Sequence, residues 1–259
     1  MLKFSVLASG SSGNCIFLKD EKNSILFDMG INYLELKYRL SHLHLNFLNL
    51  SGVFISHEHS DHVSGVKSLQ KKMAAPIYIS KPCYEEYRHR YGQLKLPHFY
   101  KLNDEVKVGN FRVIPVENSH DAVCTASFLI EHGSKRIGIL TDTGCITKRI
   151  SENFQKMDAF LLEFNHDVDM LINGHYPESL KQRIFSNRGH LSNIQAAQFV
   201  KENLDSRLKH LFLGHMSEHN NTHEKAVKAV EKIIKSEKEF EKLSPILTYH
   251  EKPTKVLEL

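Results

Sequence analysis

Short apolar runs separated by turn residues open the chain, and later runs alternate with amphipathic segments. The runs predict strands at residues 4–8, 15–18, 25–27, 53–56, 77–79, 106–116 (a hairpin turning at 109–110), 127–130, 136–140, 159–162 and 210–213. Apolar positions spaced three and four apart predict helices at 32–43, 63–73, 177–185, 193–203 and 222–240. No linker, repeat or low-complexity stretch interrupts this order. The pattern predicts one α/β domain over residues 1–259, with two sheets and outer helices.

Composition narrows the class of protein. The 259 residues are 41% hydrophobic and 25% charged, which excludes a disordered or collagen-like chain. No apolar run approaches the ~20 residues that span a bilayer, and residues 1–7 resemble a strand more than a secretory signal. The four cysteines form no C-x-x-C pair, so we expect reduced thiols in a cytoplasmic protein without membrane attachment. The net charge of +4 permits an anionic partner without demanding one.

Histidine is unusually abundant in the composition, because the 17 His residues outnumber the 13 Gly residues. Six of the most informative positions are consecutive: residues 57–62 read His-Glu-His-Ser-Asp-His and directly follow the predicted strand 53–56. Four potential ligands at one strand end are costly to bury unpaired. They are suited to holding divalent cations ~3.5–4 Å apart, a template for hydrolysis. The alternative, a solvent-exposed polar loop, explains the pattern less well.

Three further groups stand at the ends of predicted strands. His120 follows the strand that ends at 116, Asp142 ends the strand 136–140, and His215 ends the strand 210–213. A single histidine at a strand end is more often a surface or capping residue than a ligand. Together with the loop 57–62, however, these three side chains supply the remaining imidazoles and a carboxylate able to bridge two cations.

The ordered set His-x-His-x-Asp-His, lone His, lone Asp and lone His resembles the metallo-β-lactamase superfamily, over nearly the whole chain. The resemblance implies a four-layer αββα sandwich with two divalent metal ions, Zn or Mn. It implies that the first metal site consists of His57, His59 and His120. The second site would consist of Asp61, His62 and His215, and Asp142 would bridge the two.

Differences from the β-lactamase pattern, together with two local motifs, indicate the branch of the superfamily. β-Lactamases of this fold generally place a cysteine where Asp142 stands, so antibiotic hydrolysis is not expected. The stretch 158–163 and the segment 189–193 resemble tRNase Z enzymes. In those enzymes a Glu orients a His that serves the scissile phosphate, which implies that Glu163 and His190 form an active-site pair. The alternative is that His190 merely precedes a helix N-cap at Ser192.

Length restricts the branch further. Only 21 residues separate His120 from Asp142, which leaves no room for the protruding arm of tRNase Z enzymes. The stretches 8–15 and 163–167 resemble the compact WalJ-type (YycJ-like) branch of bacterial exonucleases. Lys181, Arg183 and Arg188 precede His190 and are candidate phosphate contacts, although each is as readily a solvated surface charge.

The sequence therefore indicates a two-metal hydrolase, and specifically a phosphodiesterase or exonuclease whose substrate is DNA or RNA. A metal-bound hydroxide would attack phosphorus, Asp61 would orient it, and His190 would protonate the leaving oxygen. A glyoxalase II-like thioester hydrolase shares the seven-ligand pattern and remains an alternative. A non-catalytic metal-dependent nucleic-acid-binding module is the third reading, although none of the ligands is missing. The sequence carries no signal for the oligomeric state.

Overall fold

The strands form two sheets. The computed structural model describes residues 1–47, 50–241 and 243–259, and within these ranges each sheet has seven strands. In order across the first sheet these are β14 (Leu257–Glu258), β1 (Lys3–Ala8), β2 (Cys15–Lys19), β3 (Ser24–Phe27), β4 (Leu50–Phe54), β5 (Ile77–Ser80) and β6 (Pro97–Tyr100). Across the second sheet they are β13 (Pro245–Leu247), β12 (His210–Gly214), β11 (Ala159–Glu163), β10 (Lys135–Leu140), β9 (Ala126–His132), β8 (Phe111–Glu117) and β7 (Val106–Val108).

The strand directions decide where polar side chains gather. In the first sheet β3, β4, β5 and β6 are parallel, and in the second β10, β11, β12 and β13 are parallel. The remaining neighbours pair antiparallel, and among them β7 and β8 form the hairpin predicted over 106–116. Parallel strands end at the same edge of a sheet, and ligands of α/β proteins bind outside those carboxyl ends. The loops that follow β3, β4, β10, β11 and β12 therefore open on one side of the molecule.

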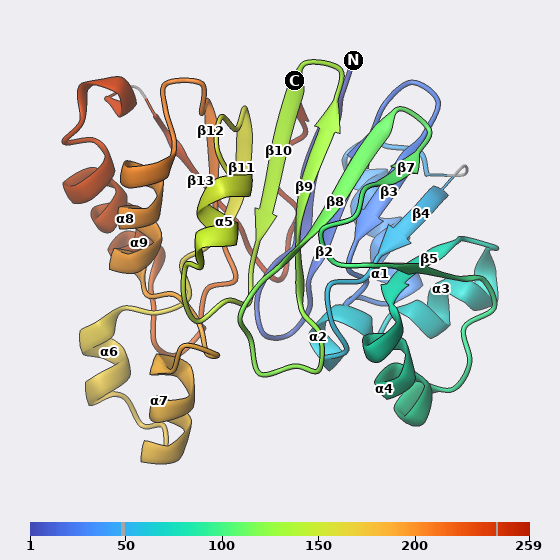
Figure 1. Ribbon diagram of the computed structural model, residues 1–259, viewed down its shortest axis with the longest axis horizontal. Helices are drawn as coiled ribbons and strands as arrows, with labels where there is room; N and C mark the ends of the chain where they lie inside the picture. The colour runs from blue at the N-terminus through green and yellow to red at the C-terminus, as the bar shows by residue number, and fades with distance from the viewer. Residues whose placement is uncertain (48–49, 242) are drawn as a thin grey trace.

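Helices cover the outer face of each sheet, which confirms the predicted four-layer αββα sandwich (Figure 1). The first sheet packs against α1 (Tyr33–His42), α3 (Val66–Lys72) and α4 (Lys81–Tyr91). The second packs against α5 (Lys148–Asn153), α8 (Asn193–Asn203) and α9 (His223–Ala229). Between the sheets lies an aromatic core that includes Phe4, Phe27, Phe54, Phe128 and Phe212, all essentially inaccessible to solvent.

Helix α8 illustrates how local sequence sets an element that carries the site. Ser192 is its N-cap and accepts a hydrogen bond from the Gln195 backbone, while the Gln195 side chain reciprocates. Ala196, Ala197, Phe199 and Val200 form its buried face, as the predicted 3.6-residue period requires. The cap fixes the start of the helix, and with it the position of the preceding residues 189–191.

Three short helices lie at the end of the sandwich where the parallel strands finish. They are α2 (Ser60–Val63), α6 (Val168–Asn173) and α7 (Glu178–Phe185). In Figure 1, α6 and α7 extend beyond the lower end of the second sheet. Helix α7 buries Ile184 but leaves Phe185 exposed, so most of its surface faces solvent. No helix in the described ranges combines the length and apolar character needed to traverse a bilayer.

Two predicted helices differ from the structure. The helix expected over 222–240 is α-helical only to Ala229, continues as a π-helix over Val230–Ile234, and then ends. Phe240 is buried in the same core as Val230 and Ile234, but it reaches that core from a separate 3₁₀ turn over Lys238–Phe240. The helix expected over 63–73 begins earlier as α2 and breaks before α3. A Cβ on Gly65 would stand 1.8 Å from the Ile31 carbonyl oxygen, so the chain passes too close for a regular helix.

Candidate metal centre

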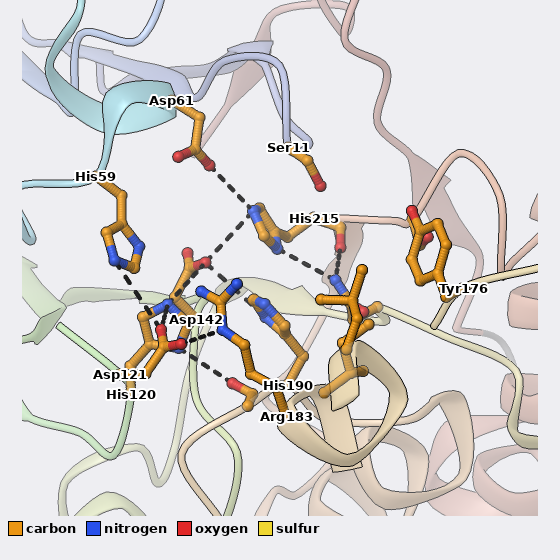
Figure 2. Close-up of a pocket in the computed structure, with 15 residues that line it drawn as sticks. Ser11, His59, Asp61, His120, Asp121, Asp142, Tyr176, Arg183, His190 and His215 are labelled. Carbon is orange, nitrogen blue, oxygen red and sulfur yellow. Dashed lines mark hydrogen bonds and ion pairs between the residues drawn. The ribbon is translucent and has the colours of Figure 1, made fainter. Parts of the chain in front are cut away.

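All seven predicted metal ligands lie at the edge where the parallel strands end. His57, His59, Asp61 and His62 occupy the segment from β4 into α2. His120 follows β8, Asp142 follows β10 and His215 follows β12. Figure 2 shows the side chains of His59, Asp61, His120, Asp142 and His215 pointing toward a common space. Topology, rather than sequence proximity, therefore assembles the group.

The first predicted set comprises His57, His59 and His120, whose ligand atoms lie within 4.8 Å of one another. His57 Nε2 is 3.1 Å from His59 Nδ1. The opposite nitrogens of two rings are held from behind: His120 Nδ1 donates to the Gly189 carbonyl at 3.1 Å, and His57 Nδ1 donates to Ser56 Oγ at 2.9 Å. Such bonds fix the tautomer, so that the Nε2 lone pairs face the space between the rings.

The second predicted set comprises Asp61, His62 and His215, again within 4.8 Å. Asp61 Oδ2 is 3.2 Å from His62 Nε2 and 3.6 Å from His215 Nε2. His62 Nδ1 donates to Asp28 Oδ2 at 2.7 Å, and Asp28 also accepts from the Ser56 backbone and hydroxyl. A carboxylate behind a histidine is the usual support of a metal-ligating imidazole.

Asp142 lies between the two sets. Its Oδ2 is 3.3 Å from His62 Nε2, and its Oδ1 is 3.4 Å from His215 Nε2 and 3.9 Å from His120 Nε2. Among the described residues, Asp142 Oδ2 and His215 Nε2 are buried atoms without a hydrogen-bond partner. Buried polar atoms are rarely left so, and each one calls for a missing partner.

The spacing of the donors fits a divalent cation. Two ligands about 2.0–2.2 Å from one tetrahedral zinc ion stand roughly 3.3–3.6 Å apart. The separations given above, between ligand atoms within the two sets and from these sets to Asp142, run from 3.1 to 3.9 Å. Imidazole nitrogens and carboxylate oxygens at about this spacing are ligands that suit a zinc or manganese ion. The potential metal-binding groups of the described residues contain no cysteine, and Cys145 is not among them.

The two sets differ in protonation. Burial lowers the pKa of His57 well below its usual value, and the neighbouring imidazoles of His62 and His120 add to this. Burial likewise lowers the pKa of His120. Burial acts in the same direction on His62 and His215, but the carboxylates around them outweigh it: the pKa of His62 is raised well above the usual value and that of His215 to about 10. Without metal, burial therefore favours the neutral form of His57 and His120, whereas the surrounding carboxylates favour the protonated form of His62 and His215.

The backbone at the strand ends is strained. Asp28, Asp142 and His215 have positive φ angles of 58°, 57° and 47°. Residues other than glycine seldom adopt this left-handed conformation, and it is concentrated at functional sites. Close packing adds a further constraint, because a Cβ on Gly30 would stand 1.7 Å from the Asp61 carbonyl oxygen. Two residues after Asp28, this glycine lets the loop that follows β3 lie against the start of α2.

Glu163 and His190, the pair predicted beside the metal ligands, are in contact. His190 Nδ1 donates to Glu163 Oε2 at 3.1 Å, and the His190 ring stacks on His215 with centroids 5.2 Å apart. Glu163 is fully buried at the end of β11. Burial opposes its ionisation, but the hydrogen bond from His190 and the nearby His215 imidazole hold the pKa of Glu163 below the usual range. The same carboxylate accepts three backbone N–H groups, from Asp142 (3.2 Å), Thr143 (2.9 Å) and Leu191 (3.1 Å).

A polar cavity of about 220 Å³ opens above these residues. Its floor includes His59, Asp61, His120, Asp142, His190 and His215, and α7 contributes Leu180, Arg183 and Ile184 to one wall. Of the basic residues expected to contact phosphate, Arg183 lines the cavity. Lys181 instead donates to the Ile172 carbonyl at 2.6 Å, and Arg188 donates to the His120 carbonyl at 3.1 Å.

Two acidic residues of the site escape sequence reasoning. Asp28 supports His62, and its signal is a carboxylate directly after a buried strand, the same pattern that singled out Asp142. Asp121 follows His120 and hydrogen-bonds Arg183. Burial disfavours its ionisation, but the Arg183 bond and the nearby His120 lower the pKa of Asp121. No sequence signal links Asp121 to Arg183, because 62 positions separate them.

Comparison with known proteins is consistent with this centre. Residues 23–216 match the family described as "Beta-lactamase superfamily domain". The exodeoxyribonuclease YycJ of Bacillus anthracis is 32% identical over 235 residues, 90% of this chain and 89% of the relative. The exodeoxyribonuclease WalJ of Streptococcus pneumoniae is 34% identical over 228 residues, 86% of this chain and 85% of the relative.

Solved structures share the fold. The metallo-β-lactamase fold protein YhfI of Bacillus subtilis superposes with a TM-score of 0.75 over 100% of both chains, at 18% sequence identity. The matched residues 23–216 contain every predicted ligand, from His57 to His215. The chain therefore belongs to the beta-lactamase superfamily, as a metal-dependent hydrolase of the metallo-β-lactamase fold that is related to the YycJ and WalJ exonucleases.

Proposed function

We propose that this hydrolase is an exonuclease that cleaves the phosphodiester bonds of DNA. The observation that carries the proposal is the Glu163–His190 pair, joined at 3.1 Å, whose imidazole lines a cavity shared with residues of both ligand sets. The relatives matched along most of their length are named exodeoxyribonucleases, which favours DNA over RNA. An anionic substrate also suits a cavity to which Arg183 contributes.

We assign two divalent ions, Zn or Mn, to the centre. His57, His59 and His120 would hold one ion, Asp61, His62 and His215 the other, and Asp142 would bridge them. Bound divalent ions supply an activated water and neutralise charge on a phosphoryl oxygen. Asp61 is 17% exposed at the cavity, so its carboxylate is also placed to orient that water.

His190 has the contacts of a proton donor. Because Nδ1 is bound to the ionised Glu163, the nitrogen left for the substrate is Nε2. The proton moves from Nε2 to the departing alkoxide oxygen, while the Nδ1 proton stays on the Glu163 hydrogen bond. A general acid of this kind contributes about 10²–10⁴-fold to the rate. Glu163 holds the ring in one orientation throughout, because three backbone N–H groups fix the carboxylate.

The dimensions of the cavity favour action at a chain end. Pockets that enclose whole small-molecule ligands are roughly 300–1,000 Å³. The cavity of about 220 Å³ is smaller, so it admits a phosphate with part of one nucleotide. Helices α6 and α7 extend beyond the end of the second sheet (Figure 1), and α7 forms one wall of the cavity, so we infer that they restrict how a continuous duplex approaches. A strand terminus meets neither restriction.

Thioester hydrolysis is the competing reaction for the same seven ligands. A thiol has a pKa of about 8.5, so a thiolate departs without a proton, whereas an alkoxide does not. A buried glutamate that holds an imidazole at the cavity is unnecessary for thioesters. The Glu163–His190 pair therefore favours the phosphodiester.

The test is a side-by-side assay of metal-loaded protein on end-labelled single- and double-stranded DNA, RNA of the same sequence, and a glutathione thioester. We expect DNA to be shortened stepwise from one end. The His190→Ala variant is the matched negative, and Arg112→Ala, which removes an arginine of β8 paired with Glu105 and Glu131, is the positive control. Internal cleavage products or preferential thioester turnover would contradict the proposal.

A further inference from the structure

The pair formed by Asp121 and Arg183 has no role in the chemistry described above. Arg183 Nε donates to Asp121 Oδ2, and the arginine side chain is 56% exposed at the wall of the cavity. The other carboxylate oxygen, Oδ1, is buried and has no hydrogen-bond partner among the described residues. One oxygen of the carboxylate therefore binds the guanidinium, while the other contacts only histidine side chains.

The second oxygen of Asp121, Oδ1, faces the first ligand set. Asp121 Oδ1 is 3.2 Å from His120 Nε2 and 3.9 Å from His59 Nε2. The value of 3.2 Å equals the separation between Asp61 Oδ2 and His62 Nε2 in the second set. Figure 2 shows Asp121 beside His120, with the Arg183 side chain approaching from the opposite side. An oxygen anion thus stands between a guanidinium and the imidazoles assigned to one cation.

This position has the chemistry of a phosphate subsite. A phosphodiester carries one negative charge and presents two non-bridging oxygens, one able to accept from an arginine while the other faces a metal centre. The Asp121 carboxylate has the same charge and the same two-oxygen geometry. Resting on the proposed function, we propose that Asp121 is a displaceable stand-in for the substrate phosphate, which takes over Arg183 and the position beside His120 on binding.

The proposal makes Arg183 the specificity-determining residue for phosphate and Asp121 its competitor. Exchange of one monoanion for another conserves the charge of the site, so substrate entry does not leave Arg183 or the centre unpaired. The other two carboxylates that line the cavity, Asp61 and Asp142, are not available as competitors of phosphate, because they belong to the predicted metal ligands. The Lys181 and Arg188 side chains are bound to backbone carbonyls and do not compete for the phosphate.

The experiment titrates inorganic phosphate into metal-loaded protein by isothermal calorimetry, so that its readout is independent of turnover. Asp121→Asn keeps the shape of the side chain and removes the competing charge. We expect it to bind phosphate about tenfold more tightly, equivalent to roughly 1.4 kcal/mol. Arg183→Ala should bind phosphate about tenfold more weakly. Arg112→Ala removes an arginine of similar exposure, 53%, and should bind phosphate like the wild type.

The sign of the Asp121→Asn effect decides the question. Weaker or unchanged phosphate binding would mean that Asp121 only positions Arg183, and loss of metal on elemental analysis would mean that it is a ligand; either overturns the proposal. Asp121→Ser serves as the second variant if the amide fails to fold by circular dichroism. The proposed function fails separately, if wild-type protein leaves every oligonucleotide intact while the phosphate titrations still differ.

Discussion

Substitutions of Glu163 and His190 separate the effect of this pair on stability from its effect on turnover. Each of its oxygens accepts two hydrogen bonds: Oε1 from the Thr143 and Leu191 backbones, and Oε2 from the Asp142 backbone and His190 Nδ1. Glu163→Gln replaces one oxygen by an NH₂ group that faces two N–H donors. Two hydrogen bonds to a buried charge are lost, at about 1.5–3 kcal/mol each. We therefore expect the free energy of unfolding to fall by about 3–6 kcal/mol.

His190→Ala removes a single partner from a partly exposed position, and three backbone N–H groups remain on Glu163. Its stability should change by about 1 kcal/mol or less, while turnover of DNA falls by roughly 10²–10⁴-fold. A phosphodiester with a nitrophenolate leaving group needs no proton, so His190→Ala should cleave it almost normally. The sequence assigns Glu163 only the orientation of His190. In the structure the same carboxylate, at the end of β11, also binds the backbone that follows β10, at Asp142 and Thr143.

The assay is urea unfolding followed by circular dichroism, together with metal analysis and both substrates. Glu117→Gln, at an exposed position on β8, is the matched control and should lie within about 0.5 kcal/mol of the wild type. Equal stability of the Glu163→Gln and wild-type proteins would refute the anchoring argument. Equal loss by His190→Ala on the natural and activated substrates would refute its role as a proton donor.

Elemental analysis of protein purified without chelator should approach two equivalents of metal, and Asp142→Ala should reduce both occupancies while His57→Ala chiefly reduces one. Occupancy should also depend on pH unequally. His62 and His215 have raised pKa values, so a metal ion must displace their protons before it binds. The second site should therefore fill at higher pH than the first, which a spectroscopic titration with Co²⁺ would measure. Filling of both sites over the same pH range would contradict this. Cys145→Ser should keep metal content and most activity, and metal loss from it would show that the ligand set is misassigned.

The sequence predicts the ligands well because the signal is local. Four of the seven stand within residues 57–62, and each of the others directly follows a recognisable strand. Parallel strand order then brings them together without further information. The pattern of apolar positions does not predict helix α4, because Lys81–Tyr91 is mostly polar and buries only Cys83 and Tyr87. Its start is nonetheless encoded by the Ser80 cap and the following proline.

What the sequence does not predict depends on contacts between distant segments. The hydrogen bond between Asp121 and Arg183 forms because α7 lies against the loop that follows β8. The sequence of neither segment indicates this contact. The support of His62 by Asp28 likewise requires β3 and β4 to be parallel neighbours. The apolar period continues beyond Ile234 to Phe240, so periodicity alone does not show that the helix ends between them and that Phe240 enters the core from a separate turn.

The left-handed backbone at Asp28, Asp142 and His215 bears on how much of this protein a cell contains. Each such residue costs about 1–3 kcal/mol, and bound metal offsets that cost only in the folded chain. Marginally stable chains are removed by proteases in proportion to the fraction that is unfolded. Scarcity of zinc or manganese should therefore lower the steady-state abundance of the enzyme as well as its specific activity. Replacing these residues by glycine relieves the backbone but deletes the side chains, so the strain persists wherever the centre does.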